Sequence, residues 1–432
     1  MERDEIVGYH LEQAVRYLAE LGQPDAALAE RAAQRLAAAG RRASDRADGR
    51  AGLALLSRAV ELLRPVGLDL ALELEAAWAM DAVDVRAAAA AADAVAERAG
   101  AEGDRSGAML ARALALYLRT FSGDFSAIAE QQELCRAALP LEEERGDPRR
   151  LALLWRLLAY ASNFRMQNDD CVHAAGQALS YRRLAGDSPS SSVGLVWSLI
   201  LGPRPADEAL RMRDELAAVR PPGSTDLGRA VMLAMLDRTD EAWPLAEARS
   251  NHLREVSGGS FAGEQYLAAI AMIEGDRQRA CRHHFELVDG LPPGSDGLAA
   301  SYRLLIARDL CYVGRFEEAE PQLRQAQDVP PSQNSRAQGT AVEALLLAAR
   351  GEFERAEALA RAAVAVAETE TDTVWLQVWG YEDLASVLER GGRIGEAREA
   401  LEGALAVWER KRCLPYVRRI RDRIDALGRA AV

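Results

Sequence analysis

A glycine recurs in a fixed register through the C-terminal half of the chain, and it constrains the fold more than any other feature. Gly275, Gly314, Gly351 and Gly392 stand 39, 37 and 41 residues apart. Each has an alanine seven residues before it and another five residues after it. Glycine readily adopts the left-handed backbone that ends a helix, and small alanines let two helices approach closely. The register therefore predicts helical hairpins that turn at each glycine.

Large apolar residues follow the turns and indicate where the second helix of each hairpin begins. Phe316, Phe353 and Ile394 stand two residues after the last three glycines. MQNDDCVHAAGQAL, 166–179, places Asn168 in the corresponding turn, since asparagine tolerates that backbone. A lone hairpin cannot bury its outer face, so hairpins stack. The pattern predicts an all-α, right-handed α-solenoid, and its structural turn residues are Gly123, Gly275, Gly314, Gly351 and Gly392.

Composition supports this fold and narrows the function. Helix-forming alanine, leucine, arginine and glutamate dominate, and aromatic residues make up 6% of the 432 residues. A formal net charge of −13 argues against a protein that coats nucleic acid or an anionic membrane. The sequence has no apolar run long enough to span a bilayer and no signal segment, and its cysteines form no CxxC motif. We therefore expect a cytoplasmic protein without disulfides.

The domain organisation follows from the same repeat. We expect one solenoid over 1–432, with an N-terminal capping helix at 1–22 and a C-terminal capping helix at 412–432. About ten hairpins would fill 26–411. The stretch 186–225 is the least regular, so we expect a bend in the superhelix there.

Two stretches of sequence resemble known repeat proteins. The hairpins resemble tetratricopeptide repeats, although the glycine spacing exceeds the usual period of about 34 residues. A junction in large bacterial signalling ATPases resembles DEIVGYHLEQAVRYLAELG, 4–22, followed by LAERAAQRLAAAGRRA, 28–43, and LLSRAVELL, 55–63. In those cyclase-linked and LuxR-type regulators, the NTPase module gives way there to a tetratricopeptide sensor region.

The resemblance implies a sensor region whose binding of a protein partner regulates a signalling ATPase, cyclase or transcription module. The chain itself lacks a phosphate-binding loop, because its only lysine, Lys411, lies in WERKRC without preceding glycines. Its C-terminal segment also lacks a recognition helix after a turn. We therefore expect that a chain extended upstream of Met1 encodes the phosphate-binding loop.

Aromatic and arginine side chains on the first helices of the hairpins are the candidate partner-binding residues. First helices line the concave face of such a superhelix, where exposed aromatic and arginine residues anchor bound peptides. For the two tryptophans, which are spaced i, i+4, the sequence favours packing inside the core over partner binding, and the same ambiguity applies to Tyr302 and Arg303. The candidates are Tyr302, Arg303, Trp375, Trp379 and Tyr381.

The CRHHF segment, 281–285, contains three possible metal ligands. Cys281 and His284 share one face of a helix, but His283 points elsewhere, which leaves two ligands where zinc needs three or four. We therefore predict that His284 is a buried, hydrogen-bonded histidine and that the chain holds no metal. No cofactor motif or nucleophile constellation occurs, so we predict no catalytic residues and no enzymatic activity.

A basic cluster near the C-terminus supports two interpretations. It could dock an acidic partner or nucleic acid, or it could be the solvated face of the capping helix. For the whole chain, we predict a non-catalytic solenoid that binds a protein or peptide, and the alternative is a small molecule bound inside the superhelix. The cluster comprises Arg410, Lys411, Arg412, Arg418, Arg419, Arg421 and Arg423.

Overall fold

The computed structural model describes residues 3–46, 48–186, 193–217, 226–257, 261–331 and 333–430. These residues form 22 α-helices and one 3-10 helix, and they contain no strand. The predicted all-α solenoid of tetratricopeptide-like hairpins is confirmed. The chain divides into two compact units, the first of Met1–Ala161, Ala174–Ser191 and Pro292–Gly294, the second of Ser162–His173, Ser192–Leu291 and Ser295–Val432.

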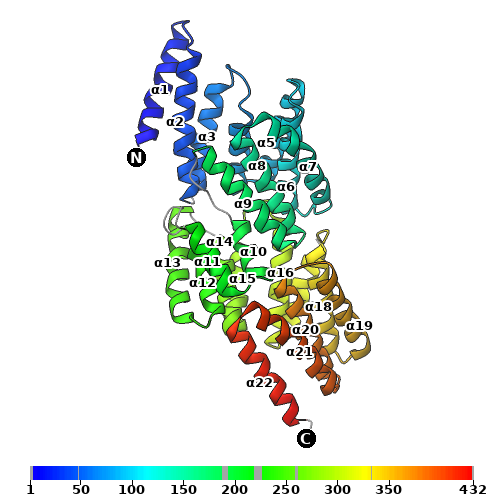
Figure 1. Cartoon of the computed structure of the whole chain (residues 1–432). Coiled ribbons are helices and arrows are strands. Elements are labelled where there is room, and N and C mark those ends of the chain that lie inside the picture. The colour runs from blue at the N-terminus through cyan, green and yellow to red at the C-terminus, as the bar shows by residue number, and fades with distance from the viewer. Residues whose placement is uncertain are drawn as a thin grey trace. The chain divides into compact units, whose positions relative to one another are not determined.

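The first unit is a series of antiparallel helices in which each packs against the next (Figure 1). Five of the helices begin immediately after an aspartate whose carboxylate accepts a hydrogen bond from a backbone N–H of the first turn, namely Asp25, Asp48, Asp69, Asp84 and Asp104. The unit contains α1 (Arg3–Glu20), α2 (Ala26–Asp45), α3 (Gly49–Leu63), α4 (Leu70–Ala79), η1 (Met80–Ala82), α5 (Val85–Ala101), α6 (Arg105–Phe121), α7 (Ala127–Arg145) and most of α8 (Pro148–Phe164) and α9 (Asn168–Leu184).

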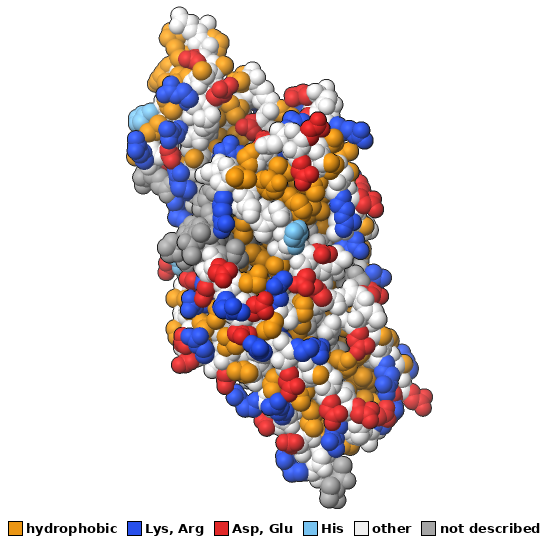
Figure 2. Space-filling model, viewed as in Figure 1, with side chains coloured by type: hydrophobic (Ala, Val, Ile, Leu, Met, Phe, Trp, Pro, Cys, Tyr) orange, Lys and Arg blue, Asp and Glu red, His pale blue; other side chains and the backbone are white. Residues whose placement is uncertain are grey.

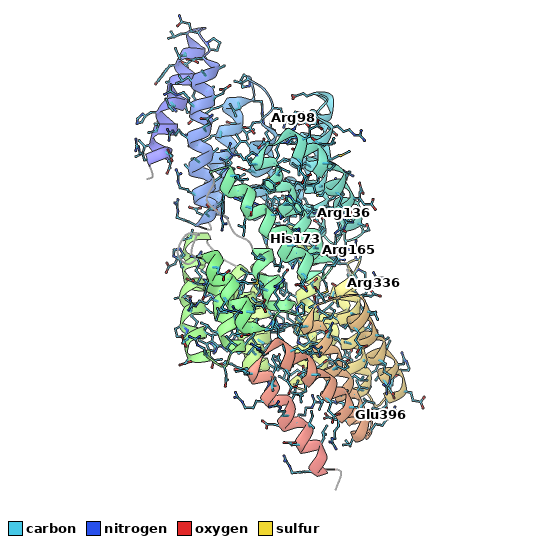
Figure 3. The ribbon with its side chains drawn as sticks, in the orientation of Figure 1. Arg98, Arg136, Arg165, His173, Arg336 and Glu396 are labelled. Carbon is cyan, nitrogen blue, oxygen red and sulfur yellow. The ribbon has the colours of Figure 1, made fainter. Side chains whose placement is uncertain are left out.

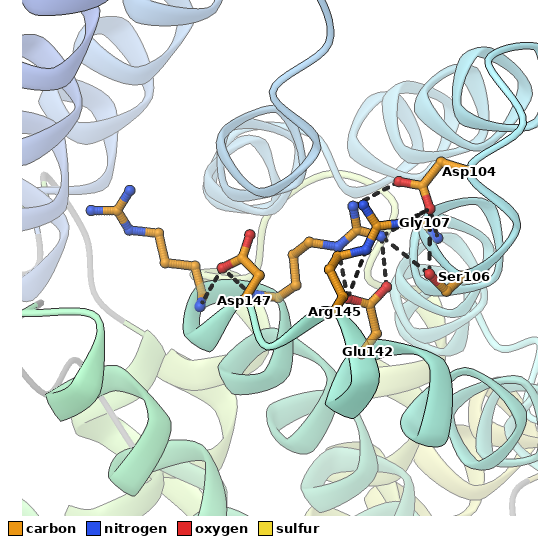
Figure 4. Close-up of polar contacts among 8 residues, drawn as sticks. Asp104, Ser106, Gly107, Glu142, Arg145 and Asp147 are labelled. Carbon is orange, nitrogen blue, oxygen red and sulfur yellow. Dashed lines mark hydrogen bonds and ion pairs between the residues drawn. The ribbon is translucent and has the colours of Figure 1, made fainter.

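A buried ion cluster ties three of these helices together (Figure 4). Arg150 near the start of α8 donates to Glu142 at the end of α7 through contacts of 2.8 and 2.6 Å. It also donates to Asp104 at 2.6 Å, and Asp104 caps α6 by accepting from the Gly107 N–H. Because Glu142 is fully buried, removing the arginine would leave an uncompensated charge.

An aromatic cluster joins alternate helices of the first unit. The ring centroids of Trp78 on α4 and Tyr117 on α6 lie 4.9 Å apart, and those of Tyr117 and Tyr160 on α8 lie 4.7 Å apart. The Arg156 guanidinium lies 3.2 Å from the Trp78 ring centroid, which is a cation–π contact. Contact between alternate helices is the packing expected of stacked hairpins.

The second unit repeats this packing over a longer series of helices. Alternate helices α10, α12 and α14 pack against one another in order, as do α16, α18 and α20. Tyr302 on α16 links the two sets by donating a hydrogen bond to Gln265 on α14. The unit contains α10 (Val193–Leu201), α11 (Ala206–Ala217), α12 (Asp226–Met235), α13 (Thr239–Ser257), α14 (Phe261–Glu274), α15 (Arg277–Asp289), α16 (Asp296–Tyr312), α17 (Phe316–Gln327), α18 (Gln333–Ala349), α19 (Phe353–Thr369), α20 (Val374–Arg390), α21 (Ile394–Lys411) and α22 (Leu414–Ala430).

The glycines that carry the repeat lie in the turns between helices. Gly123, Gly275, Gly314, Gly351 and Gly392 have φ values of 98°, 93°, 78°, 83° and 77°, which L side chains rarely adopt. The interpretation of Asn168 as the turn residue is wrong. Asn168 is the first residue of α9, and the left-handed position before that helix belongs to Met166, with φ 59°.

The surface of the second unit is covered by paired charges. Arg side chains alternate with Asp and Glu on the visible face (Figure 2), since the only lysine of the chain, Lys411, is buried. One example is Glu396 on α21 (Figure 3), which accepts hydrogen bonds from Arg361 at 2.8 Å and from Arg393. Such exposed pairs contribute little stability, typically about 0–1 kcal/mol each.

The predicted domain organisation stays a prediction. The first and last described helices run over 3–20 and 414–430. The predicted bend at 186–225 includes 187–192 and 218–225, which lie outside the described residues. None of the helices in the described parts of the chain has both the length and the apolar composition that crossing a membrane requires.

Candidate functional site

The C-terminal helix α22 of the second unit packs against α12 and α14 as well as against its neighbour α21. Three cations at or near its start lie at the C-terminal ends of three helices. Lys411 donates from Nζ to the carbonyls of Leu199 and Gly202, at 2.7 and 2.8 Å, where α10 ends. A helix ends with unpaired carbonyls and a negative dipole, so a cation there is favourable.

Arg418 and Arg419 make the corresponding contacts with α12 and α14. Arg418 forms a two-pronged ion pair, of 2.9 and 3.0 Å, with Asp237 just after α12. The hydrogen bond from Arg418 holds the pKa of Asp237 below its usual value. Arg419 donates to the carbonyl of Met272, at 3.2 Å, and to that of Ile273 at the end of α14.

The close approach of Arg419 also explains why Gly275 has no side chain. A Cβ built on Gly275 would lie 3.2 Å from Cδ of Arg419, which is tighter than ordinary contact. Gly275 therefore serves the turn after α14 and also makes room for α22.

An aromatic core fixes the base of α22. Tyr416 stacks on Trp408 with ring centroids 4.4 Å apart, and Trp375 lies edge-on to Trp408 at 5.6 Å. The indole N–H of Trp375 donates to the Ile200 carbonyl at 3.3 Å, which satisfies a third carbonyl at the end of α10. Aromatic pairs of this kind contribute about 0.5–1.5 kcal/mol beyond the area that they bury.

A buried ion network lies beside this aromatic core. Arg308 on α16 donates to both carboxylate oxygens of Asp383 on α20 at 3.0 Å, and to Glu382 at 3.2 Å. Tyr312 donates to Asp383 at 2.7 Å. Arg308 and Asp383 are 3% and 1% exposed, so each charge depends on the other for compensation.

Four buried donor groups in this region make no hydrogen bond with any described residue. They are Arg308 Nη1, Trp379 Nε1, Trp408 Nε1 and Tyr416 Oη. An unpaired buried donor costs about 1–3 kcal/mol, so a polar group that accepts hydrogen bonds would be stabilised here.

The predicted partner-binding residues do not form one exposed surface. Trp375 and Trp379 are 2% and 7% exposed, because α21 and α22 cover the first of them and Arg308 approaches the second. The favoured interpretation of the two tryptophans, packing inside the core, agrees with this burial, and their rings are not available to anchor a partner. Of the half-buried residues, Tyr302 donates to Gln265 at 2.6 Å, Arg303 donates to Gln322 at 3.0 Å, and Tyr381 donates to Glu368. Partner binding by these three stays a prediction.

The histidine and cysteine side chains follow the sequence prediction more closely. His284 is 1% exposed, and its Nδ1 lies 3.0 Å from Asp309. The prediction of a buried, hydrogen-bonded His284 is confirmed. All five cysteines are free and buried.

The capping role of the basic cluster was missed by the sequence analysis. Neither interpretation, a docking surface for an acidic partner or nucleic acid or a solvated face, included contacts with helix ends 146 to 212 residues away. Lys411 is the only lysine of the chain, but that alone did not indicate which helix end its compact ammonium would cap.

The comparisons with known proteins give structural likeness only. No protein-family model matches the sequence, and no curated protein matches it. Among solved structures, the Cut9–Hcn1 hetero-tetramer of the APC/C matches with 11% identity and a TM-score of 0.47, covering 94% of this chain and 87% of that one. Yeast Tom70 matches with 12% identity and a TM-score of 0.34, covering 92% and 96%. A human IFIT1 dimer with PPP-AAAA matches with 12% identity and a TM-score of 0.44, covering 99% and 95%. Because these scores lie below 0.5, the fold assignment rests on the helices and turns of the chain itself.

Proposed function

We propose that this chain is a non-catalytic sensor solenoid that recognises a helical protein segment and thereby regulates a signalling ATPase, cyclase or transcription module. The regulatory part rests on the resemblance of residues 4–63 to the junction in such regulators. The binding part rests on one observation, the way in which the second unit holds α22.

The chemistry around α22 defines the segment that this surface accepts. The ends of α10, α12 and α14 accept hydrogen bonds or ion pairs from cations, and an aromatic core receives the apolar side of the helix. Tyr416 and Ile420 are buried while Arg418 is exposed, so α22 is amphipathic. A partner helix with the same spacing of basic and apolar residues would compete with α22 for this surface.

A peptide-binding experiment on the full chain tests this function. A fluorescent synthetic peptide of residues 411–430 is titrated into the wild type and into the variant R418E/R419E. In this variant, the new glutamates repel Asp237 and the carbonyls of Met272 and Ile273, so α22 should leave the surface. We expect saturable binding to the variant and at least tenfold weaker binding to the wild type, whose own α22 occupies the surface. R418A serves as a milder variant. A peptide that itself carries both glutamates is the control and should not bind.

Absence of saturable binding to both variants, while their circular dichroism remains helical, would rule out this surface as a helix-binding site. Equal binding of the control peptide would show that the contact is nonspecific.

The unpartnered donors favour a second candidate function, which is small-molecule sensing inside the second unit. Arg308, Trp379 and Tyr416 would donate to a ligand rich in acceptor atoms, such as a carboxylate or phosphate metabolite. Calorimetry against metabolite pools tests this idea. A saturable heat of binding that disappears in Y416F would support a ligand bound at Tyr416. A heat of binding that is unchanged in Y416F would show that the ligand does not bind there.

A further inference from the structure

A cluster of metal-ligating side chains lies on α14 and α15, away from the contacts of α22 described above. Glu264 on α14, His283 on α15 and Glu286 one turn further along α15 each offer a ligand atom, and these atoms all lie within 4.8 Å of one another. His283 Nδ1 lies 2.8 Å from Glu264 and 3.8 Å from Glu286. One imidazole nitrogen therefore faces two carboxylates from two helices.

The surroundings of this cluster are partly shielded from water. The side chains of Glu264 and His283 are 4% and 12% exposed, while Glu286 is about half exposed. His283 Nε2 makes no hydrogen bond with any described residue, so no second contact fixes the tautomer of the ring. Facing the Glu264 carboxylate at 2.8 Å, Nδ1 is the donor and carries the ring proton. A cation between the carboxylates would bind Nδ1 once that proton has moved to Nε2, which has no hydrogen bond to any described residue.

Arg254 now supplies positive charge at this position. Its guanidinium pairs with Glu264 and lies 3.9 Å from Glu286. With a neutral histidine, two carboxylates and one guanidinium leave the cluster one unit negative. The Arg254 side chain is 43% exposed, so it can turn into solvent when another cation replaces it.

We propose that Glu264, His283 and Glu286 form a site for a divalent transition metal of the zinc class. One imidazole and two carboxylates are a ligand set that zinc accepts, and water completes the coordination. The metal would link α14 to α15 and exclude Arg254. The sequence prediction of no metal rested on the side chains of CRHHF alone. Glu264 lies nineteen residues before His283, and the fold brings it to the imidazole as a further ligand.

Zinc titration of the full chain tests the proposal, with calorimetry for affinity and thermal unfolding for the structural effect. We expect one Zn²⁺ per chain and a raised Tm. R254Q should bind about tenfold tighter, because a competing cation is removed, and H283A should bind at least tenfold weaker. Magnesium, which prefers oxygen ligands, should bind far more weakly than zinc. H10A removes a histidine of α1 and serves as the matched control.

Zinc binding that is equal in the wild type, R254Q and H283A would overturn the proposal, because the bound ion would then lie elsewhere. Failure of the well-folded R254Q variant to bind zinc would overturn it as well. Loss of binding in H283A supports the site only where H10A retains it and the circular dichroism of H283A is unchanged.

Discussion

Lys411 and Leu199 are 212 residues apart in the sequence, and the ammonium of Lys411 donates a 2.7 Å hydrogen bond to the Leu199 carbonyl. The lysine is fully buried at the end of α21, and it also binds the Gly202 carbonyl. A second long-range contact caps the N-terminal end of a helix, where backbone N–H groups are unpaired. Asp372, just before α20, accepts from the backbone N–H groups of Asn168 and Asp169 at the start of α9. Contacts between helix ends and charged side chains far apart in sequence therefore hold the helices of the second unit together.

The buried ammonium predicts a specific pH dependence of stability. Burial lowers the pKa of Lys411 to about 7, against 10.5 for an unperturbed lysine. Between these values the unfolded chain binds more protons than the folded chain, so this group makes the protein more stable as pH rises. From pH 7 to 8.5 we expect a gain of about 1–2 kcal/mol in the free energy of unfolding.

Urea unfolding of the wild type and of K411M at both pH values checks this prediction. The difference between the two proteins cancels the contributions of other titrating groups. An identical pH dependence in K411M would contradict the assignment.

The ion pair between Arg308 and Asp383 should be costly to break. D383A leaves a buried guanidinium without its main partner and should lower the free energy of unfolding by about 3–5 kcal/mol. R308M/D383L replaces both charges with apolar groups, so it should recover most of that loss. The exposed pair of Arg393 and Glu396 is the matched control, and E396A should lower the free energy of unfolding much less than D383A does, because solvent screens an exposed pair. Equal losses in D383A and E396A would contradict the role of burial.

Gly275 should tolerate alanine less well than Gly351 does. Both have positive φ, and a left-handed backbone costs a non-glycine residue about 1–2 kcal/mol. Only Gly275 also faces a neighbour, since a new Cβ there meets Arg419, whereas nothing lies within 4 Å of a Cβ at Gly351. We expect a lower Tm for G275A than for G351A, measured by calorimetry. The reverse order would show that α22 does not approach the turn.

Repeating local features were readable from the sequence, whereas single long-range contacts were not. The turn at Gly314 follows from a pattern that recurs along the chain and depends on a few neighbouring residues. The spacing of Trp375 and Trp379 identified a shared helix face, but it could not show which helix covers that face. The cap that Lys411 provides on α10 occurs once, joins distant segments and has no pattern that would reveal it.

Crosslinking between α22 and α12 tests most directly whether the C-terminal helix packs against the end of α12. Asp237 and Arg418 are partners in the structure, and both are exposed at the surface, so cysteines there would react with a short bis-maleimide. The five native cysteines are buried, and burial raises the pKa of four of them (Cys135, Cys281, Cys311 and Cys413) to about 12, so they should remain unmodified. In D237C/R418C we expect a crosslinked peptide that joins positions 237 and 418, found by mass spectrometry. If both cysteines react fully with a single-ended maleimide but never become linked, α22 does not lie across the end of α12.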